Sequence, residues 1–227
     1  MMNFNWLKNF RSLFLTAACP LCDRPAEDIL CQACEKQLQR HRLAQPAASW
    51  QGELPLLVWG SYGGILKRAI AAMKYENRPE IAELFGELLG RAWLDASPSL
   101  PKMVVVPLPM NPEKRQQRGF DQAELIARNF CYQTGLPLKC QGLQRVKKTQ
   151  PLFDLNPRER ELMMQDAFAL GQDFQKQRPR LSVLLVDDIF TTGNTVKSGA
   201  RTLSRSGIRV GGVAAVASPR GKTTANR

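Results

Sequence analysis

The sequence predicts an α/β domain with a mainly parallel sheet, preceded by a small module that carries four cysteines. Three observations support this prediction. The apolar run 183–186 is followed by two acids, a short loop and a helical pattern, as expected for a strand buried on both faces of a parallel sheet. A second apolar run, 103–107, ends at prolines, which a central strand does not tolerate. Two Cys-x-x-Cys pairs lie within residues 19–34.

The stretch 183–195 reads Val-Leu-Leu-Val-Asp-Asp-Ile-Phe-Thr-Thr-Gly-Asn-Thr and carries the strongest functional signal. A hydroxyl-rich loop that contains a glycine and opens a helix directs backbone N–H groups at one point, where an anion such as phosphate can bind. The acids Asp187 and Asp188 would repel a phosphate but suit hydroxyl groups. A ribose 5-phosphate would therefore match both halves of the stretch. An ordinary strand that ends in an Asp-rich turn is the simpler alternative.

Shorter patterns complete the α/β domain, for which we expect the bounds 54–217. Strands are predicted at 54–62, 103–109 and 209–217, and helices at 65–75, at 79–94 and after the stretch 183–195, because apolar residues recur there at helical spacing. A further helix should turn Ala123, Ile126, Ala127 and Phe130 inward. The ligand is expected at the carboxyl ends of the strands.

A basic segment separates the 103–109 strand from that helix. It holds Lys114, Arg115 and Arg118 within five residues. Guanidinium groups beyond the end of a parallel strand can bind phosphate oxygens through paired hydrogen bonds. Taken singly, each of these cations can equally be a solvated surface residue.

The four cysteines Cys19, Cys22, Cys31 and Cys34 predict a structural zinc site. Each Cys-x-x-Cys pair can turn both thiolates inward, and four thiolates satisfy tetrahedral zinc without leaving a position for catalysis. Disulfides and an iron–sulfur cluster are the alternatives, and disulfides are disfavoured in a reducing compartment. The only histidine, His41, is expected to be solvated rather than a ligand.

The remaining boundaries follow from composition. Residues 1–18 predict an amphipathic helix that docks on the protein rather than anchoring it in a membrane, and no segment has the roughly 20 apolar residues of a spanning helix. We expect a cytoplasmic protein with the zinc module at 19–40, a linker at 41–53 and a disordered tail at 218–227.

The net charge of +12 is concentrated in the second part of the chain. Residues 1–100 hold 11 Lys and Arg against 10 Asp and Glu, whereas residues 101–227 hold 21 against 10. Such a basic surface attracts polyanions without sequence specificity, so contact with DNA or RNA is a hypothesis. No element for reading bases accompanies it.

These motifs together resemble known proteins. The stretch 183–195 resembles the motif with which type I phosphoribosyltransferases bind 5-phosphoribosyl 1-diphosphate (PRPP). Together with Pro-Leu-Pro at 107–109, Arg-x-x-Arg-Gly-Phe-x-Gln-Ala-Glu at 115–124 and the cysteine pairs, it is similar to the ComF/GntX family of bacterial proteins. The resemblance runs from about residue 19 to 217 and includes a Lys-Tyr segment at 74–75.

The resemblance implies a type I phosphoribosyltransferase-like fold and roles for individual residues. Two acids would bind the ribose hydroxyls, the loop would cradle the 5-phosphate, two arginines would face the diphosphate, and Mg²⁺ would bridge that diphosphate. The implied PRPP-binding residues are Asp187, Asp188, Thr191, Thr192, Gly193, Asn194, Thr195, Arg115 and Arg118. The catalytic candidates are Asp187, Asp188, Arg145 and Lys147, the last two in a segment similar to the loop that closes over PRPP.

The chain departs from the family pattern at two positions. Asp121 stands where asparagine is usual, and Met163 stands where another asparagine is usual. Both departures weaken the inference of any catalytic step that would use those side chains. The motif at 183–195 is intact.

Two functions of different classes follow. Family members are linked to DNA uptake and to use of external DNA as a nutrient, so the chain is expected to bind PRPP or a phosphoribosyl nucleotide with Mg²⁺ in such a role. If it is an enzyme, it would transfer the phosphoribosyl group to a nitrogen nucleophile. The alternative is a non-catalytic PRPP or nucleotide sensor, or a DNA-uptake adaptor, that contacts DNA or machinery proteins through the zinc module and the basic face. A purely structural adaptor is the least favoured reading.

Overall fold

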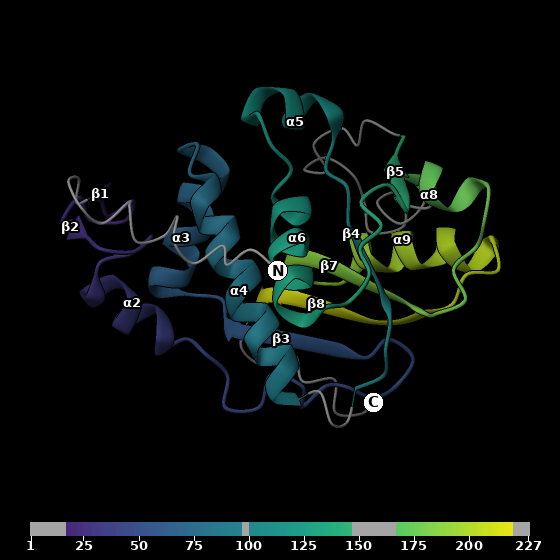
Figure 1. Ribbon diagram of the computed structural model, residues 1–227, viewed down its shortest axis with the longest axis horizontal. Helices are drawn as coiled ribbons and strands as arrows, with labels where there is room; N and C mark the ends of the chain where they lie inside the picture. The colour runs from purple at the N-terminus through teal and green to yellow at the C-terminus, as the bar shows by residue number, and fades with distance from the viewer. Residues whose placement is uncertain (1–16, 97–99, 147–166, 220–227) are drawn as a thin grey trace, which may run out of the picture.

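The computed structural model describes residues 17–96, 100–146 and 167–219, and its centre is a four-stranded parallel sheet (Figure 1). The strand order is β3-β8-β7-β4, with every neighbouring pair parallel. The strands span β3 (Leu56–Ser61), β4 (Val104–Pro107), β7 (Val183–Ile189) and β8 (Val210–Ser218). The predicted α/β class and its four strands are confirmed.

Helices cover both faces of this sheet. Alternate residues of the strands point to opposite faces, so Leu184 and Val186 of β7 pack with the helices α3 (Gly64–Tyr75), α4 (Pro79–Ala96) and α6 (Gln122–Thr134). On the other face, Val183 and Leu185 pack against α9 (Asn194–Arg205) and the short helix α8 (Gln172–Gln175). The four residues predicted to face inward from α6 are all buried.

The helices α4 and α6 approach each other unusually closely. A Cβ atom at Gly86 would lie 2.4 Å from the backbone oxygen of Ile126, and one at Gly90 would lie 2.7 Å from Cβ of Gln133. Any side chain at these positions would collide with α6, so glycine is what permits the contact. The packing fixes the position of α6, whose first turn lies near the carboxyl end of β4.

The basic segment after β4, for which we predict no helix or strand from the sequence, is the helix α5 (Pro112–Arg118). Its start is marked by Asn111, whose side chain accepts a hydrogen bond from the backbone N–H of Glu113 at 2.8 Å, and by Pro112 in the first turn. Its end is marked by Gly119 in the left-handed region, with φ of 80°. The local signals were therefore present in the sequence.

The cysteine module precedes the sheet and lies beside α3 (Figure 1). It consists of the paired strands β1 (Ala17–Ala18) and β2 (Pro25–Ala26) and the helix α2 (Gln32–Gln39). The predicted N-terminal helix was wrong for its last two residues, since backbone pairing with β2 makes them a strand. The rest of that prediction, residues 1–16, lies outside the described residues.

The predicted linker 41–53 lies along the edge of the sheet. The backbone N–H of Leu43 donates to the oxygen of Trp59, and the N–H of Leu56 donates to the oxygen of Ser49, both at 2.9 Å. His41 is half-buried, and its Nδ1 lies 3.0 Å from the backbone oxygen of Ser61, so the expectation of a solvated side chain was wrong. These contacts attach the module to β3.

A small antiparallel ribbon lies beside α9, formed by β5 (Leu143–Arg145) and β6 (Phe168–Leu170). Between them, Lys147 and Met163 lie outside the described residues. At the other end of the chain, Ser218 is the last residue of β8, so the predicted tail begins one residue too early, and residues 220–227 are not described. Within the described ranges, no helix has both the length and the apolar character needed to cross a membrane.

Candidate functional site

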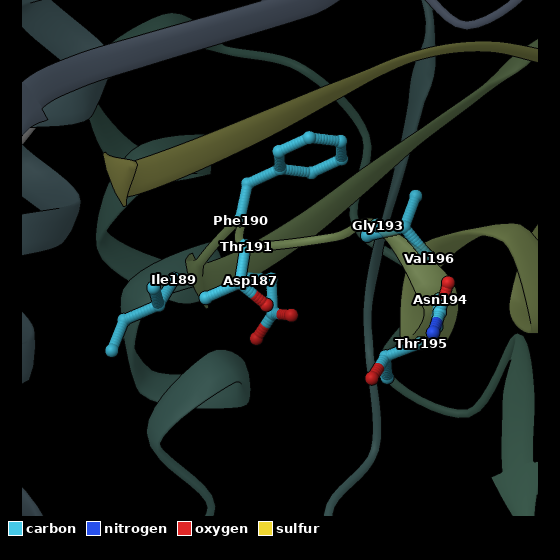
Figure 2. A pocket seen from close by; sticks show the side chains of 8 residues that line it. All are labelled: Asp187, Ile189, Phe190, Thr191, Gly193, Asn194, Thr195 and Val196. Carbon is cyan, nitrogen blue, oxygen red and sulfur yellow. The ribbon is translucent and has the colours of Figure 1, made fainter. Parts of the chain in front are cut away.

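A pocket opens where β7 meets α9, at the carboxyl end of the strand (Figure 2). Gly193 precedes the first residue of the helix with φ of 74°, a left-handed conformation that suits glycine. This turn brings the loop after β7 back onto the start of α9. The pocket is lined by Asp187, Ile189, Phe190, Thr191, Gly193, Asn194, Thr195 and Val196.

Polar groups face the pocket from two sides. The carboxylate of Asp187 projects from β7, and the side chains of Asn194 and Thr195 lie across from it on the first turn of α9 (Figure 2). The first turn of a helix offers backbone N–H groups that lack partners within the helix, together with the positive end of the helix dipole. An anion fits the α9 side, and hydroxyl groups fit the Asp187 side. Of the predicted loop residues, Thr192 is exposed and does not line the pocket.

The two adjacent acids have different partners. Oδ2 of Asp188 lies 2.7 Å from Nζ of Lys74, and only 6% of the Asp188 side chain and 19% of the Lys74 side chain is exposed. Asp188 is thus held by α3, on the side away from the pocket lining. The sequence indicates Lys74 only as part of a Lys-Tyr segment, because nothing local in the sequence shows that it meets Asp188.

Asp187 is half-buried and accepts a hydrogen bond from the backbone N–H of Asp188 at 2.8 Å. Its pKa is raised well above the ordinary value, chiefly because burial disfavours the carboxylate and secondly because Asp188 repels it. The N–H of Asp188 and the charge of Lys74 oppose this shift in the pKa. In its ionised form, the Asp187 carboxylate can accept hydrogen bonds from a ligand in the pocket that it lines.

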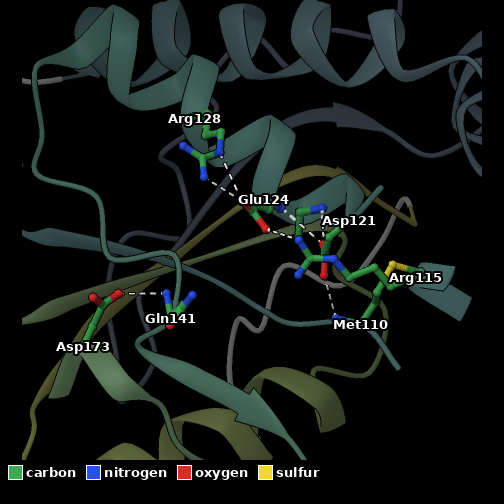
Figure 3. A network of polar contacts seen from close by, with 8 residues as sticks. Met110, Arg115, Asp121, Glu124, Arg128, Gln141 and Asp173 are labelled. Atoms are coloured by element: carbon green, nitrogen blue, oxygen red, sulfur yellow. Dashed lines mark hydrogen bonds and ion pairs between the residues drawn. The ribbon is translucent and has the colours of Figure 1, made fainter. Parts of the chain in front are cut away.

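The two predicted arginines lie on α5 and do not line the pocket. Arg115 pairs with Glu124 at 3.1 Å, and Glu124 also pairs with Arg128 (Figure 3). Arg118 donates a hydrogen bond to the side chain of Gln122. Its guanidinium carbon lies 6.0 Å from the ring centroid of Tyr75 on α3.

Asp121, which stands where asparagine is usual in the resembled family, has a structural role. One carboxylate oxygen accepts from the backbone N–H groups of Ala123 and Glu124, and the other accepts from that of Met110 at 3.0 Å (Figure 3). Burial raises the pKa of Asp121, and these hydrogen bonds oppose the rise. An asparagine has a single acceptor oxygen and could not fill both places. The carboxylate therefore caps α6 and ties it to the segment after β4.

Arg145, a catalytic candidate, lies at the end of β5 with its guanidinium carbon 5.2 Å from the ring centroid of Phe168. Burial lowers its pKa, while the charge of Asp187 acts in the opposite direction. The structure therefore brings Arg145 within electrostatic reach of the pocket. The other loop candidate, Lys147, lies outside the described residues.

The four predicted metal ligands meet in one cluster. The sulfur atoms of Cys19, Cys22, Cys31 and Cys34 lie within 4.8 Å of one another, and none forms a disulfide. Ligand sulfurs at about 2.3 Å from a tetrahedral metal lie roughly 3.8 Å apart, so the cluster fits such an ion.

The thiols of the cluster differ in acidity. For the thiols alone, the backbone N–H of Cys34 lowers the pKa of Cys31 to about 7, whereas burial raises the pKa of Cys34 to about 12. A cation bound among them would favour the thiolate form of each.

The chain is similar over most of its length to curated bacterial proteins. It is 27% identical over 227 residues to competence protein F of Haemophilus influenzae, covering 92% of this chain and 95% of that protein. Identity to competence protein ComFC of Bacillus subtilis is 26% over 193 residues, 83% of this chain and 72% of that protein. DNA utilization protein YhgH of Salmonella typhimurium is 30% identical over 193 residues, 83% of this chain and 78% of that protein. The chain belongs to the ComF family. The ComF assignment confirms the resemblance found in the sequence, although no protein-family model matches.

Solved structures that resemble this ComF-family chain include phosphoribosyltransferases. Adenine phosphoribosyltransferase from Leishmania donovani is 12% identical with a TM-score of 0.39, covering 86% of this chain and 87% of that one. The enzyme from Trypanosoma brucei, solved with AMP, pyrophosphate and ribose-5-phosphate, is 12% identical with a TM-score of 0.39, covering 82% of this chain and 67% of that one. Because these TM-scores are below 0.5, the fold assignment rests on the parallel sheet and its flanking helices.

Proposed function

We propose that this ComF-family protein binds PRPP or a phosphoribosyl nucleotide with Mg²⁺ at the carboxyl end of β7, and that it serves the uptake or use of external DNA. One observation carries the binding proposal: the carboxylate of Asp187 and the first turn of α9 face the same pocket from opposite sides. The names of the relatives, which refer to competence and DNA utilization, support the biological role.

The two sides of the pocket suit the two parts of a phosphoribosyl group. Backbone N–H groups at the start of α9, with the hydroxyls of Thr191 and Thr195, would hold the 5-phosphate. Asp187 would accept hydrogen bonds from ribose hydroxyls, which are stronger to a carboxylate than to a neutral oxygen. In this proposal Asp188 acts mainly through its ion pair with Lys74, which positions Asp187.

The diphosphate of PRPP would extend out of the pocket toward cations on neighbouring elements. Arg115 and Arg118 on α5 and Arg145 on β5 are the described candidates to bind its oxygens. Mg²⁺, when bound, would neutralise the diphosphate while keeping several of its waters, so it needs few protein ligands. Asp187, the carboxylate that lines the pocket, could supply one of them.

The same site supports one reaction class, phosphoribosyl transfer. A bond would form between the anomeric carbon and a nitrogen nucleophile while the bond from that carbon to the diphosphate oxygen breaks. Diphosphate would leave with the electron pair of that bond, and the proton of the nucleophile would pass to water. Positioning the two reactants and stabilising the departing negative charge through arginines account for catalysis of this kind.

The ion pairs at the site favour a second candidate, sensing of PRPP or a nucleotide without transfer. A ligand that recruits Asp188 or Arg115 must exchange the existing pairs with Lys74 and Glu124. Binding would then be coupled to a shift of α3 or α5, which could be transmitted to DNA or to a protein partner through the cysteine module beside α3. For that module we propose zinc as the structural metal, because four thiolates and no open position are typical of zinc.

Calorimetric titration of the full chain with PRPP and Mg²⁺ tests the site. Asp187→Asn should weaken binding about 10- to 150-fold, since a hydrogen bond to a charged group contributes about 1.5–3 kcal/mol. Asp95→Asn, on the exposed pair with Arg42, should leave the affinity unchanged. Absence of PRPP binding by the unaltered protein would contradict the proposal.

Two further measurements divide the alternatives. Release of diphosphate on addition of nucleobases to the PRPP complex would establish transfer, and binding without release would favour sensing. Full growth of a deletion strain on DNA as a nutrient would contradict the role in DNA use.

A further inference from the structure

An exposed tyrosine ends the helix α3, which is tied to the acid pair through Lys74, and it does not line the pocket. Tyr75 is the last residue of α3 and is 80% exposed. Its neighbour Lys74 reaches Asp188 at 2.7 Å, and Asp188 follows the pocket residue Asp187. Tyr75 therefore lies at the end of α3 that reaches β7 through Lys74.

The ring of Tyr75 is also met by a cation from a different helix. The guanidinium of Arg118, at the end of α5, lies 6.0 Å from the ring centroid, and it is directed by its hydrogen bond to Gln122. A planar guanidinium and an aromatic ring are the two kinds of surface on which nucleobases stack. An isolated exposed aromatic residue needs no explanation, but a paired one in this position does.

A ligand that extends from the pocket across the carboxyl end of β7 toward α3 would meet these groups in the order of a nucleotide. The α9 end of the pocket suits the phosphate and Asp187 suits the ribose hydroxyls across from it. Asp188 and Lys74 pair on the α3 side of β7, and Tyr75 follows Lys74 at the end of α3. A nucleoside 5′-monophosphate has its phosphate, ribose and base in the same sequence.

We propose that Tyr75, with Arg118 at its side, is the stacking surface for the base of a nucleotide whose ribose 5-phosphate lies in the β7–α9 pocket. This inference rests on the proposed function and extends it from the phosphoribosyl group to the nucleobase. Because stacking uses the ring face that every base has, the surface distinguishes a nucleotide from a sugar phosphate but discriminates little among bases.

The test compares ligands with and without a base. Affinities of the full chain for AMP, UMP and ribose 5-phosphate are measured with Mg²⁺ by calorimetry. The nucleotides should bind about 5- to 150-fold more tightly than ribose 5-phosphate, the range that one stacked base contributes. Tyr75→Ala should remove most of this difference and leave ribose 5-phosphate binding unchanged, whereas Tyr75→Phe should preserve it.

Tyr132 provides a matched control, because it is 81% exposed but lies near the far end of α6, 10 residues or about 15 Å from the turn at Gln122. Tyr132→Ala should leave all three affinities unchanged. An equal effect of Tyr75→Ala on nucleotides and on ribose 5-phosphate would overturn the inference, because it would mean that the pocket itself had changed. So would an unchanged nucleotide preference.

Three outcomes separate a failure of the stacking surface from a failure of the proposed function and from stacking of the bases of a DNA strand. If ribose 5-phosphate and PRPP bind but Tyr75→Ala has no effect, the stacking surface fails and the proposed function stands. If neither binds to the unaltered protein, both fail. An oligothymidylate and an abasic oligomer of equal length complete the set. A Tyr75-dependent difference found only with these oligomers would assign the ring to a DNA strand and overturn the mononucleotide assignment.

Discussion

The cysteine module and the β7–α9 pocket come from opposite ends of the chain and rest on different amounts of packing. Between Cys19 and Cys34, the described regular structure is limited to a two-residue strand and the first turn of α2, and the buried apolar residues are few. The pocket instead follows a strand whose residues 183–186 are fully buried between β4 and β8. We infer that a bound metal organises the module, whereas the sheet shapes the pocket before any ligand arrives.

The largest effect that we expect from this difference is unfolding of the cysteine module when its metal is removed. Cys31→Ser, or a chelator, should abolish metal binding and expose the backbone amides of residues 17–40, because structural zinc contributes about 10–16 kcal/mol to folding of small metal-binding peptides. The amides of β7 and β8 should stay protected in hydrogen-exchange mass spectrometry. Cys131→Ser, outside the cluster, should retain the metal. If the amides of β7 and β8 lost their protection from hydrogen exchange together with those of the module, the module and the sheet would unfold as one cooperative unit, and the contrast between them would be wrong.

An intermediate effect concerns the ion pair behind the pocket. Lys74→Met should destabilise the protein by about 3–5 kcal/mol in urea unfolding, because it leaves the buried carboxylate of Asp188 unpaired. Adding Asp188→Asn should recover much of that loss. Arg91→Met breaks an exposed pair with Glu87 and should cost less than about 1 kcal/mol. Equal losses in the free energy of unfolding for Lys74→Met and Arg91→Met would show that packing, rather than the ion pair with Asp188, stabilises the carboxyl end of β7.

The smallest effect is a dependence of stability on pH at Asp187. Its pKa is raised in the folded protein, so its contribution to stability is full below the unfolded pKa of about 3.9 and is lost as the pH rises through the folded pKa. Asp187→Asn should therefore be more stable than the unaltered protein at pH 7, by about 0.5–2 kcal/mol, with a difference that narrows toward about pH 4. Urea unfolding across this range measures it. Lower stability of the variant at every pH would mean that the carboxylate supports the pocket.

Local sequence patterns were sufficient to predict the strands of the sheet and the strand, turn and helix that form the pocket. The stretch 183–195 combined a buried apolar run, a glycine at the turn and a helical repeat, and the structure places strand, turn and helix there. The helix α6 was likewise readable from four inward positions. The helix α5 was predictable too, from Asn111, Pro112 and Gly119, but the segment was interpreted only for its positive charges.

Contacts between distant segments could not be predicted. The ion pair of Lys74 with Asp188 joins α3 to β7, and neither residue carries a local signal for the other. The pairing of residues 41–53 with β3 depends on backbone hydrogen bonds, which almost any sequence can form. Asp121 shows the same limit, because its carboxylate was noticed only as a departure from a family pattern, and its role depends on the backbone of Met110.

The close crossing of α4 and α6 limits which substitutions the sequence can accept during evolution. At Gly86 and Gly90 only glycine fits, since the Cβ atom of even an alanine would lie 2.4 and 2.7 Å, respectively, from atoms of α6. At Gly119 nothing lies within 4 Å of an added Cβ atom, so the restriction comes from the positive φ angle alone. Asparagine, which adopts positive φ more readily than other residues with a side chain, can be tolerated there. The crossing also sets where α6 begins, and with it Asp121. Evolutionary constraint on the ligand site should therefore extend to two glycines that never touch a ligand.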